Sequence, residues 1–409
     1  MRPAARRWLI VLALFVVTFG ISTPLAAYGV FLPILAETFG WSRGAVASAL
    51  SINLLLGGVA GFAIGALADR HGPRVMLVGT VALAGTAFAL VSIVGQLWHL
   101  YLLVGVVGGV GMSSFYLLAA ATVTHWFDER RALALALVLV GFNLGYISAG
   151  PLAAWLITHL GWRRAYALLG SVCGLLTLIA ALTVRLPRPA EVPLLRRAVA
   201  GRSTTTLPGV TLGRALRDPR QWLLSLAWCL LGGLAIMVSV HAVPFARDQG
   251  ISLAAASLAL TAYGLGSASG RLSAGALSER LGVVTTIRIG FVLQITALVA
   301  LLWLPSRQML LAAMALFGAG FAASDTMVTK VIPDVFGVRA IGAIMGVLAL
   351  GWRVGAALGP ALAGFVYDAT GSYTVPFGLA PVAVVVSWVL FDLATRSSRV
   401  GVGRGQGEW

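Results

Sequence analysis

Long continuous apolar runs, separated by short charged or glycine-containing segments, constrain the fold of this chain more than any other feature. A helix that crosses a membrane needs about 20 apolar residues, because the hydrocarbon core is about 30 Å thick. Backbone groups at that depth have no water to bond to, so only helices and closed barrels span it. Barrel strands alternate apolar and polar residues, whereas these runs are continuous. We therefore predict an all-α integral membrane protein.

The composition favours a lipid-embedded protein over a soluble one. Of the 409 residues, 59% are hydrophobic and only 10% are charged, whereas soluble domains carry about 25% charged residues. A net charge of +16 is also typical of nucleic-acid-binding proteins, but here the basic side chains lie in the gaps between apolar runs. We therefore expect no nucleic-acid partner. Cys173 and Cys229 both lie in apolar runs, where we expect buried side chains and no disulfide or metal site.

Twelve runs are long enough to span a membrane. They cover approximately residues 8–36, 44–67, 75–96, 99–125, 131–158, 164–185, 221–246, 253–277, 285–304, 308–332, 340–366 and 374–395. Arg2, Arg6 and Arg7 precede the first run in the manner of a signal peptide. The run continues as far as Leu35, which is long for a signal core, so we expect an uncleaved first helix.

The one long polar interruption separates six runs from six. We predict an N-terminal six-helix bundle, a cytoplasmic linker, a C-terminal six-helix bundle and a cytoplasmic tail, covering residues 1–185, 186–219, 220–396 and 397–409 respectively. With a cytoplasmic N-terminus, the inside segments hold 22 of the 29 Lys and Arg residues, the outside loops hold 5, and two lie within spans. This asymmetry predicts a multi-pass protein of the cell's inner (plasma) membrane with both termini cytoplasmic.

The two halves of the sequence resemble each other. Residues 65–72, GALADRHG, recur 210 positions later as residues 275–282, GALSERLG, and both copies end an even-numbered span on the predicted cytoplasmic side. Gly150-Pro151 in the fifth span likewise matches Gly359-Pro360 in the eleventh. Repeated six-helix units are typical of transporters whose two halves rock around a site near the middle of the membrane.

Residues 65–74, GALADRHGPR, closely resemble the signature between helices 2 and 3 of the major facilitator superfamily. Other stretches resemble the monocarboxylate transporter and oxalate/formate antiporter branch of that superfamily. These are YGVF at 28–31, FGWSR at 39–43, WF at 126–127 before two arginines, GWR at 161–163 and GRL at 270–272. The resemblance covers nearly the whole chain and implies twelve transmembrane helices in two six-helix pseudo-repeats.

The signature residues are candidates for a cytoplasmic gate. Small residues let two helices pack closely in lipid, and an acidic side chain there accepts hydrogen bonds from a neighbouring helix N-terminus or an arginine. An acid contributes little to the positive-inside asymmetry, which favours a gating role over a purely topological one. The gate residues that we predict are Gly65, Asp69, Arg70, Gly72 and Arg74 in the first copy, and Gly275, Glu279 and Arg280 in the second.

Arg271 is a candidate for binding substrate within the eighth span. A charged group at membrane depth costs at least about 2.5 kcal/mol and usually faces a cavity or a partner. Small neighbours leave room around its guanidinium, whose planar fork matches a carboxylate. In the branch that the chain resembles, an arginine at this place in helix 8 is implicated in binding the substrate carboxylate. The alternative is an arginine that extends to the inner interface or pairs with an acid of the protein.

Two further charged residues lie deep in the predicted spans. Arg353 lies near the centre of the eleventh span, and oxalate-type relatives carry a lysine near this place, at a position corresponding to Arg353 or to Trp352. Asp325 in the tenth span either carries a coupling proton or neutralises one of the two arginines. The monocarboxylate branch often has an acid one turn before the helix 8 arginine, where this chain has Ser267.

Tyr28, Asn143 and Tyr146 are further candidates for contacting substrate, although polar side chains in membranes often only join helices. We predict no enzyme, because the sequence shows no catalytic triad, metal-ligand cluster or phosphate-binding loop, and we expect no cofactor. The function that we predict is secondary active transport of a small organic anion, a mono- or dicarboxylate, by a monomer, coupled to protons (symport) or to a counter-anion (antiport). Efflux of hydrophobic or cationic compounds, or a non-transporting membrane sensor, are the alternatives.

Overall fold

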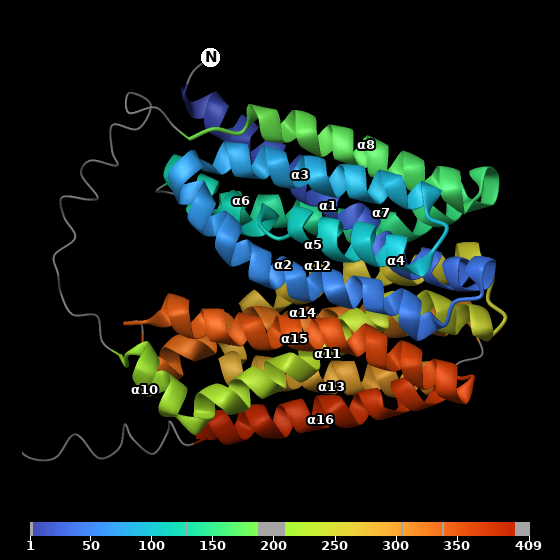
Figure 1. The fold of residues 1–409 in the computed structure, drawn as a ribbon. Helices are drawn as coiled ribbons and strands as arrows, with labels where there is room; N and C mark the ends of the chain where they lie inside the picture. The colour runs from blue at the N-terminus through green and yellow to red at the C-terminus, as the bar shows by residue number, and fades with distance from the viewer. Residues whose placement is uncertain (1–2, 128–129, 187–208, 304–305, 338, 397–409) are drawn as a thin grey trace, which may run out of the picture. The chain divides into compact units, whose positions relative to one another are not determined.

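The computed structural model describes residues 3–127, 130–186, 209–303, 306–337 and 339–396, and these residues are helical nearly throughout (Figure 1). The predicted tail and most of the predicted linker lie outside the described residues. The elements are α1 (Pro3–Phe39), α2 (Arg43–His71), α3 (Pro73–Leu90), η1 (Val91–Ile93), α4 (Leu97–Leu100), η2 (Tyr101–Val107), α5 (Gly108–Gly111), α6 (Phe115–Trp126), α7 (Arg131–Leu160), α8 (Trp162–Thr183), α10 (Leu212–Arg217), α11 (Pro219–Asp248), α12 (Leu253–Leu281), α13 (Val283–Leu302), α14 (Arg307–Phe336), α15 (Ile341–Thr370) and α16 (Thr374–Arg396).

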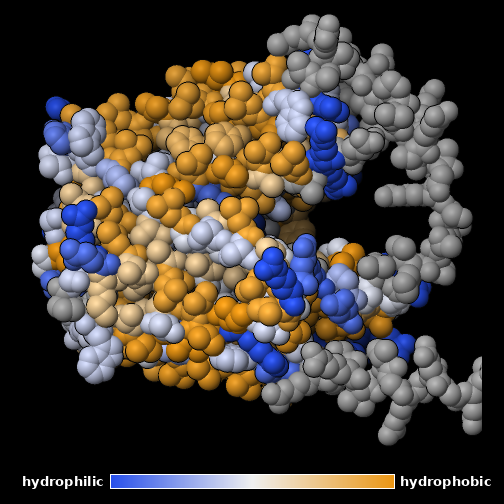
Figure 2. All heavy atoms as spheres, turned by 180° about the vertical axis from the view of Figure 1, so that it is seen from behind, coloured by the Kyte–Doolittle hydropathy of each residue, from blue (hydrophilic) through white to orange (hydrophobic). Residues whose placement is uncertain are grey.

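Eleven helical stretches in the described part of the chain are long and apolar enough to cross a membrane. Figure 2 shows apolar side chains along the length of the helices and hydrophilic side chains gathered toward their ends. The eighth predicted span is not among these eleven, because its composition is too polar. It is nevertheless a long helix. It forms α12, a helix of 29 residues whose serines, glycines and charged side chains, Arg271 among them, lower its hydropathy.

The fourth predicted span differs from the continuous helix that hydropathy predicts over 99–125. The structure divides it into α4, the π-helical η2, α5 and α6, with a break between Gly111 and Phe115. Glycines precede the break, and glycine weakens a helix; two of them also pack closely against neighbouring helices. A β-carbon on Gly109 would lie 2.8 Å from the carbonyl oxygen of Asn53 in α2, and one on Gly111 would lie 2.6 Å from the backbone nitrogen of Ala84 in α3.

The described helices form two compact units. One comprises Met1–Thr204 with Ala242–Thr261, and the other comprises Thr205–His241 with Ala262–Trp409. In the first unit α1 packs against α7 and α8, and α3 packs against α8 (Figure 1). In the second unit α13 packs against α14 and α16. Both α11 and α12 contribute residues to both units, so the predicted bundle limits at 185 and 220 stay a prediction.

The internal repeat is visible in the backbone as well as in the sequence. Glycines with positive φ recur in pairs 210 residues apart: Gly40 and Gly250 (+66° and +81°), Gly72 and Gly282 (+86° and +84°), and Gly161 and Gly371 (+77° and +67°). Gly72 joins α2 to α3, and Gly282 joins α12 to α13, in a conformation that side chains with a β-carbon rarely adopt. The fold therefore consists of two related halves, as the sequence repeat predicts.

Glycine seams hold the helices of each unit together. In the first unit, a β-carbon on Gly145 of α7 would overlap the hydroxyl of Ser22 in α1. At the equivalent position 210 residues later, a β-carbon on Gly355 of α15 would overlap the carbonyl oxygen of Cys229 in α11. Such contacts are typical of helix packing in lipid, where close backbone approach replaces the hydrophobic effect.

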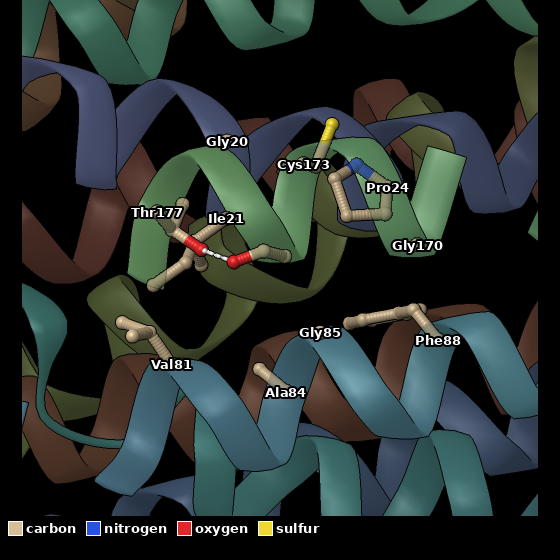
Figure 3. A pocket seen from close by; sticks show the side chains of 11 residues that line it. Gly20, Ile21, Pro24, Val81, Ala84, Gly85, Phe88, Gly170, Cys173 and Thr177 are labelled. Carbon is tan, nitrogen blue, oxygen red and sulfur yellow. Dashed lines mark hydrogen bonds between the residues drawn. The ribbon is translucent and has the colours of Figure 1, made fainter. Parts of the chain in front are cut away.

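A small apolar cavity in the first unit lies between α1, α3 and α8 (Figure 3). Its walls include Gly85 and Gly174, whose backbones approach so closely that a β-carbon on either would clash with the other. The hydroxyl of Thr177 donates its hydrogen bond to the carbonyl of Gly174 in its own helix, at 2.9 Å. No charged side chain lines this cavity, so we interpret it as a packing gap and not as a site for an ionic ligand.

Candidate functional site

Arg271 and Asp325, two of the charged residues that the sequence places at membrane depth, lie next to each other in the second unit. Nη2 of Arg271 in α12 is 4.0 Å from Oδ2 of Asp325 in α14, and each side chain is 32% exposed. Nε of Arg271 is buried and has no hydrogen-bond partner in the described part of the chain. The guanidinium is therefore neutralised at a distance but retains unused donors.

The close approach of α12 and α14 places these two side chains together. β-carbons on Gly266 and Gly270 of α12 would overlap the carbonyl oxygens of Ala315 and Ala319 in α14. On the facing helix, a β-carbon on Gly318 would overlap the carbonyl oxygen of Tyr263. Because the two backbones touch, Arg271, which directly follows Gly270, comes within reach of Asp325, six residues beyond Ala319.

Two tryptophans lie on α11 and α15 of the second unit, and one of them borders the Arg271–Asp325 pair. Trp228 of α11, which is 4% exposed, lies close to the carboxylate of Asp325. One turn along α11, Gly232 contacts Trp352 of α15 so closely that a β-carbon on the glycine would lie 2.5 Å from the carbonyl oxygen of Trp352. The indole nitrogen of Trp352 is buried, and no described residue accepts its hydrogen bond.

Arg353 follows Trp352 in α15 and is partly buried. Among the described residues nothing forms an ion pair or hydrogen bond with it. Of the two arginines that the sequence offers as partners for Asp325, the structure pairs the aspartate with Arg271. Arg353 is left as a second cation in the same unit, on the helix that carries Trp352.

The first unit holds the three uncharged candidates. Tyr28 is fully buried and its hydroxyl donates to the carbonyl of Val46, which ties α1 to α2. Tyr146 is 9% exposed, and its ring packs against Phe142 one turn earlier in α7, with 5.2 Å between ring centroids. Asn143 is partly buried. The hydroxyl of Tyr28 is therefore used in a hydrogen bond between helices. Asn143 and Tyr146 lie about one turn apart on α7.

The predicted gate residues lie at one end of α2 and of α12. Arg70 and Arg74 are exposed, as are Glu279 and Arg280, and the side chain of Asp69 lies outside the described residues. A β-carbon on Gly65 would lie 3.1 Å from the side chain of Leu117, whereas one on Gly275 would meet nothing within 4 Å. In the second copy, Nζ of Lys330 donates to the hydroxyl of Ser278 at 3.0 Å, a contact between α14 and α12.

Sequence reasoning did not predict a role for Trp228, and it did not predict the ion pair between Arg43 and Asp248. Trp228 is one of 12 tryptophans, and nothing in its neighbours along the chain distinguishes it. Arg43 pairs with Asp248 across 205 positions, with 2.7 Å between Nη1 and Oδ2. Both residues lie in predicted outside loops, where the sequence shows only two charges of opposite sign. The equal 210-residue spacing of Gly40 and Gly250 could have indicated that these two loops correspond.

Comparison with known proteins identifies the family. The model for the Major Facilitator Superfamily matches residues 10–246 and 231–407. Human monocarboxylate transporter 11 is 30% identical over 388 residues, covering 91% of this chain and 79% of the relative. The oxalate:formate antiporter of Oxalobacter formigenes is 26% identical over 258 residues, covering 62% of this chain and 59% of the relative.

Solved structures show the same fold at lower identity. The nucleoside transporter NupG, in a mutant form, superposes with a TM-score of 0.75 at 15% identity, covering 94% of this chain and 99% of that one. A bacterial homologue of the human lysosomal transporter Spinster superposes with a TM-score of 0.72 at 18% identity, covering 97% and 96%. The family and the relatives are transporters and not enzymes. This chain is a multi-pass membrane transporter that belongs to the Major Facilitator Superfamily, and its relatives include members of the monocarboxylate transporter and oxalate:formate antiporter branch.

Proposed function

We propose that this transporter moves a small organic anion, a mono- or dicarboxylate, and that Arg271 binds its carboxylate. The observation that carries the proposal is the loose ion pair of Arg271. Its 4.0 Å separation from Asp325 is well beyond the 2.7–2.9 Å of a charge-assisted hydrogen bond. Its Nε is buried without a partner among the described residues. A carboxylate would satisfy these donors in the paired geometry that guanidinium prefers.

Other arginine–aspartate pairs in this chain are tighter, so the loose pair is a property of the site. Arg220 and Asp218 approach to 2.6 Å, Arg43 and Asp248 to 2.7 Å, and Arg288 and Asp392 to 3.0 Å. A buried pair with full hydrogen bonding resists separation. A transport site needs the opposite, because the substrate must displace the internal acid at each cycle.

The second cation and the names of the relatives support an anionic cargo. Arg353 lies on α15 without an ion-pair partner in the described part of the chain, and a second positive group suits a second carboxylate. The relatives are named for monocarboxylates and for oxalate and formate. We include Asn143 and Tyr146 as uncharged contacts. Tyr28 stays a candidate, with its hydroxyl engaged by Val46.

Asp325 is the proposed coupling group. A substrate carboxylate that binds Arg271 releases Asp325 from its ion pair, and the freed carboxylate then takes up a proton or waits for the substrate to leave. The first case gives proton coupling, and the second gives exchange with a counter-anion. Both follow from competition between two carboxylates for one guanidinium.

We further propose an orientation with both termini in the cytoplasm of a cell whose inner or plasma membrane holds the protein as a monomer. The 22-to-5 distribution of basic residues supports this orientation. The signature residues Gly65, Asp69, Arg70, Gly72 and Arg74 then lie at the cytoplasmic ends of α2 and α3. Their counterparts at 275–280 lie at the cytoplasmic end of α12. Transport would proceed by rocking of the two bundles, 1–185 and 220–396.

Counterflow in proteoliposomes tests the cargo. Proteoliposomes loaded with unlabelled mono- or dicarboxylates should accumulate the labelled anion from outside. Arg271→Ala should reduce the initial rate by roughly 10- to 100-fold, because a hydrogen bond to a charged group contributes about 1.5–3 kcal/mol. Arg288→Gln is the matched control, because it removes an arginine of the same unit that pairs with Asp392 and not with Asp325; this variant should still transport. The proposal fails if no carboxylate exchanges, or if Arg271→Ala transports as well as the unaltered protein.

A further inference from the structure

A buried hydrogen bond ties α14 to α13 directly beside Asp325. Nε2 of Gln294 in α13 donates to the hydroxyl of Ser324 in α14 at 3.1 Å, and both residues are fully buried. The backbones of the two helices meet one turn earlier in α14, where a β-carbon on Gly320 would lie 2.6 Å from the carbonyl oxygen of Gly290. We call the hydrogen bond between Gln294 and Ser324 the α13–α14 clasp.

The first unit contains an equivalent hydrogen bond. Ser114 lies 210 residues before Ser324 and is also fully buried, and its hydroxyl donates to that of Thr80 in α3 at 3.3 Å. The next residue is Phe115 in the first unit and Asp325 in the second. Both halves of the repeat therefore join these helices through a buried serine, and in the second half an acid directly follows the serine.

The amide of Gln294 is not fully satisfied by the contacts it makes. Its Nε2 also donates to the carbonyl of Gly290 at 3.2 Å, but its Oε1 is buried and accepts no hydrogen bond from the described residues. A buried polar atom without a partner costs free energy, whereas an apolar side chain of similar volume carries no such cost. This favours a role for the amide other than stability.

The clasp fixes the direction in which the side chain of Asp325 projects. Successive residues of an α-helix are rotated by about 100°, so holding Ser324 toward α13 sets Asp325 on a neighbouring face of α14. On that face, Arg271 of α12 lies 4.0 Å away. Other arginine–aspartate pairs in the chain approach to 2.6–3.0 Å, the separation that charge-assisted hydrogen bonds favour. The looser pair therefore requires a restraint on α14.

We propose that Gln294 is a positioning residue: by holding Ser324 it keeps α14 from rotating toward α12, and so keeps the ion pair of Asp325 loose. This deepens the proposed function and rests on it, because Gln294 acts on the same site without touching the substrate. Without the clasp, Asp325 moves in to bond Arg271 directly and competes more strongly with the substrate carboxylate. The apparent affinity for the anion then falls, while the movement of the loaded protein is unaffected.

A double-mutant cycle in the counterflow assay tests this role. Gln294→Leu removes the donor and the unpartnered oxygen, while the hydroxyl of Ser324 keeps its bonds to the carbonyls of its own helix, so the variant should fold. Its KM for the carboxylate should rise roughly three- to ten-fold at an unchanged maximal rate. In an Asp325→Asn background, where no charged acid competes, the same substitution should leave KM unchanged. An equal rise in both backgrounds, or no rise in folded Gln294→Leu, overturns the positioning role.

Thr80→Val is the matched control, since it removes the equivalent hydrogen bond in the first unit, where Phe115 stands in place of the acid. This variant should keep the KM of the parent. Ser324→Ala removes the acceptor of the clasp and gives the same measurement should Gln294→Leu not reach the membrane.

Thermal unfolding in detergent tests the clasp without any substrate. Asp325→Asn should lower the unfolding temperature more in combination with Gln294→Leu than alone, because the tightened ion pair then contributes more to stability. An equal drop in both backgrounds overturns the clasp. If the unaltered protein exchanges no carboxylate, the proposed function fails by itself, and the unfolding cycle still decides whether Gln294 sets the ion pair.

Discussion

At the scale of single residues, the second unit concentrates charge where lipid disfavours it. Arg271 and Asp325 reduce each other's cost at depth, but 4.0 Å of separation leaves both partly solvated. Nε of Arg271 and the indole nitrogen of Trp352 are buried donors without a partner among the described residues, which favours an anionic ligand over a cationic one in this unit. This part of the second unit therefore has unused hydrogen-bond donors, which an anionic ligand could satisfy.

Asp325→Asn separates the two roles proposed for this acid. The amide cannot release a proton, so we expect accumulation driven by a pH gradient to be lost while exchange of one anion for another continues. Uptake with and without an imposed pH gradient in proteoliposomes measures both. Asp392→Asn, which removes the acid paired with Arg288, serves as the control. Undiminished uphill uptake by Asp325→Asn would remove this residue from the coupling step.

At the scale of helices, glycine seams decide which elements touch. α1 meets α7 at Gly141 and Gly145, and α11 meets α15 at Gly355, where side-chain volume would separate the backbones. The same requirement on α5 breaks the fourth span between Gly111 and Phe115. Small residues therefore do two things in this chain: they bring helices together, and where several occur in a row they interrupt the helix.

Gly141→Ala should destabilise the first unit, because the added methyl group would overlap the carbonyl oxygen of Phe15 in α1. Overpacking of this kind costs about 1–3 kcal/mol, which corresponds to a drop of several degrees in unfolding temperature. Gly79→Ala is the control within the same unit: nothing lies within 4 Å of its added carbon, and alanine is the better helix former. Thermal unfolding in detergent compares them, and equal unfolding temperatures for both variants would contradict the seam.

At the scale of the whole molecule, the repeat generates two halves whose helices correspond at an interval of 210 residues. The repeat also requires α12 to cross the membrane as α2 does, although its composition alone does not qualify it as a span. Its polarity comes from its serines and glycines, from Arg271 and from the charged residues of the second signature copy. A span that lines a transport route must be less apolar than one that faces lipid on all sides.

The topology of α12 is testable from its two ends. Gln249→Cys lies just before the helix and Leu281→Cys at its last residue, and both positions are exposed. In intact cells with the native cysteines replaced, an impermeant maleimide should label the first thiol at once and the second only after permeabilisation. Labelling of both thiols from the same side would contradict both the crossing and the repeat-based topology.

The sequence by itself determined the class of protein, the order of the spans, the repeat and the family, because hydropathy, charge asymmetry and sequence motifs can be recognised along the chain without knowledge of tertiary contacts. It also identified Arg271, Arg353 and Asp325 as residues of interest, since charge at depth is conspicuous in one dimension. Only the tertiary structure decided that Asp325 pairs with Arg271, that Trp228 lies close to the acid, that the fourth span breaks, and that Arg43 meets Asp248 across 205 positions. Those outcomes depend on which glycine contacts which backbone, and on contacts between helices that no local pattern specifies.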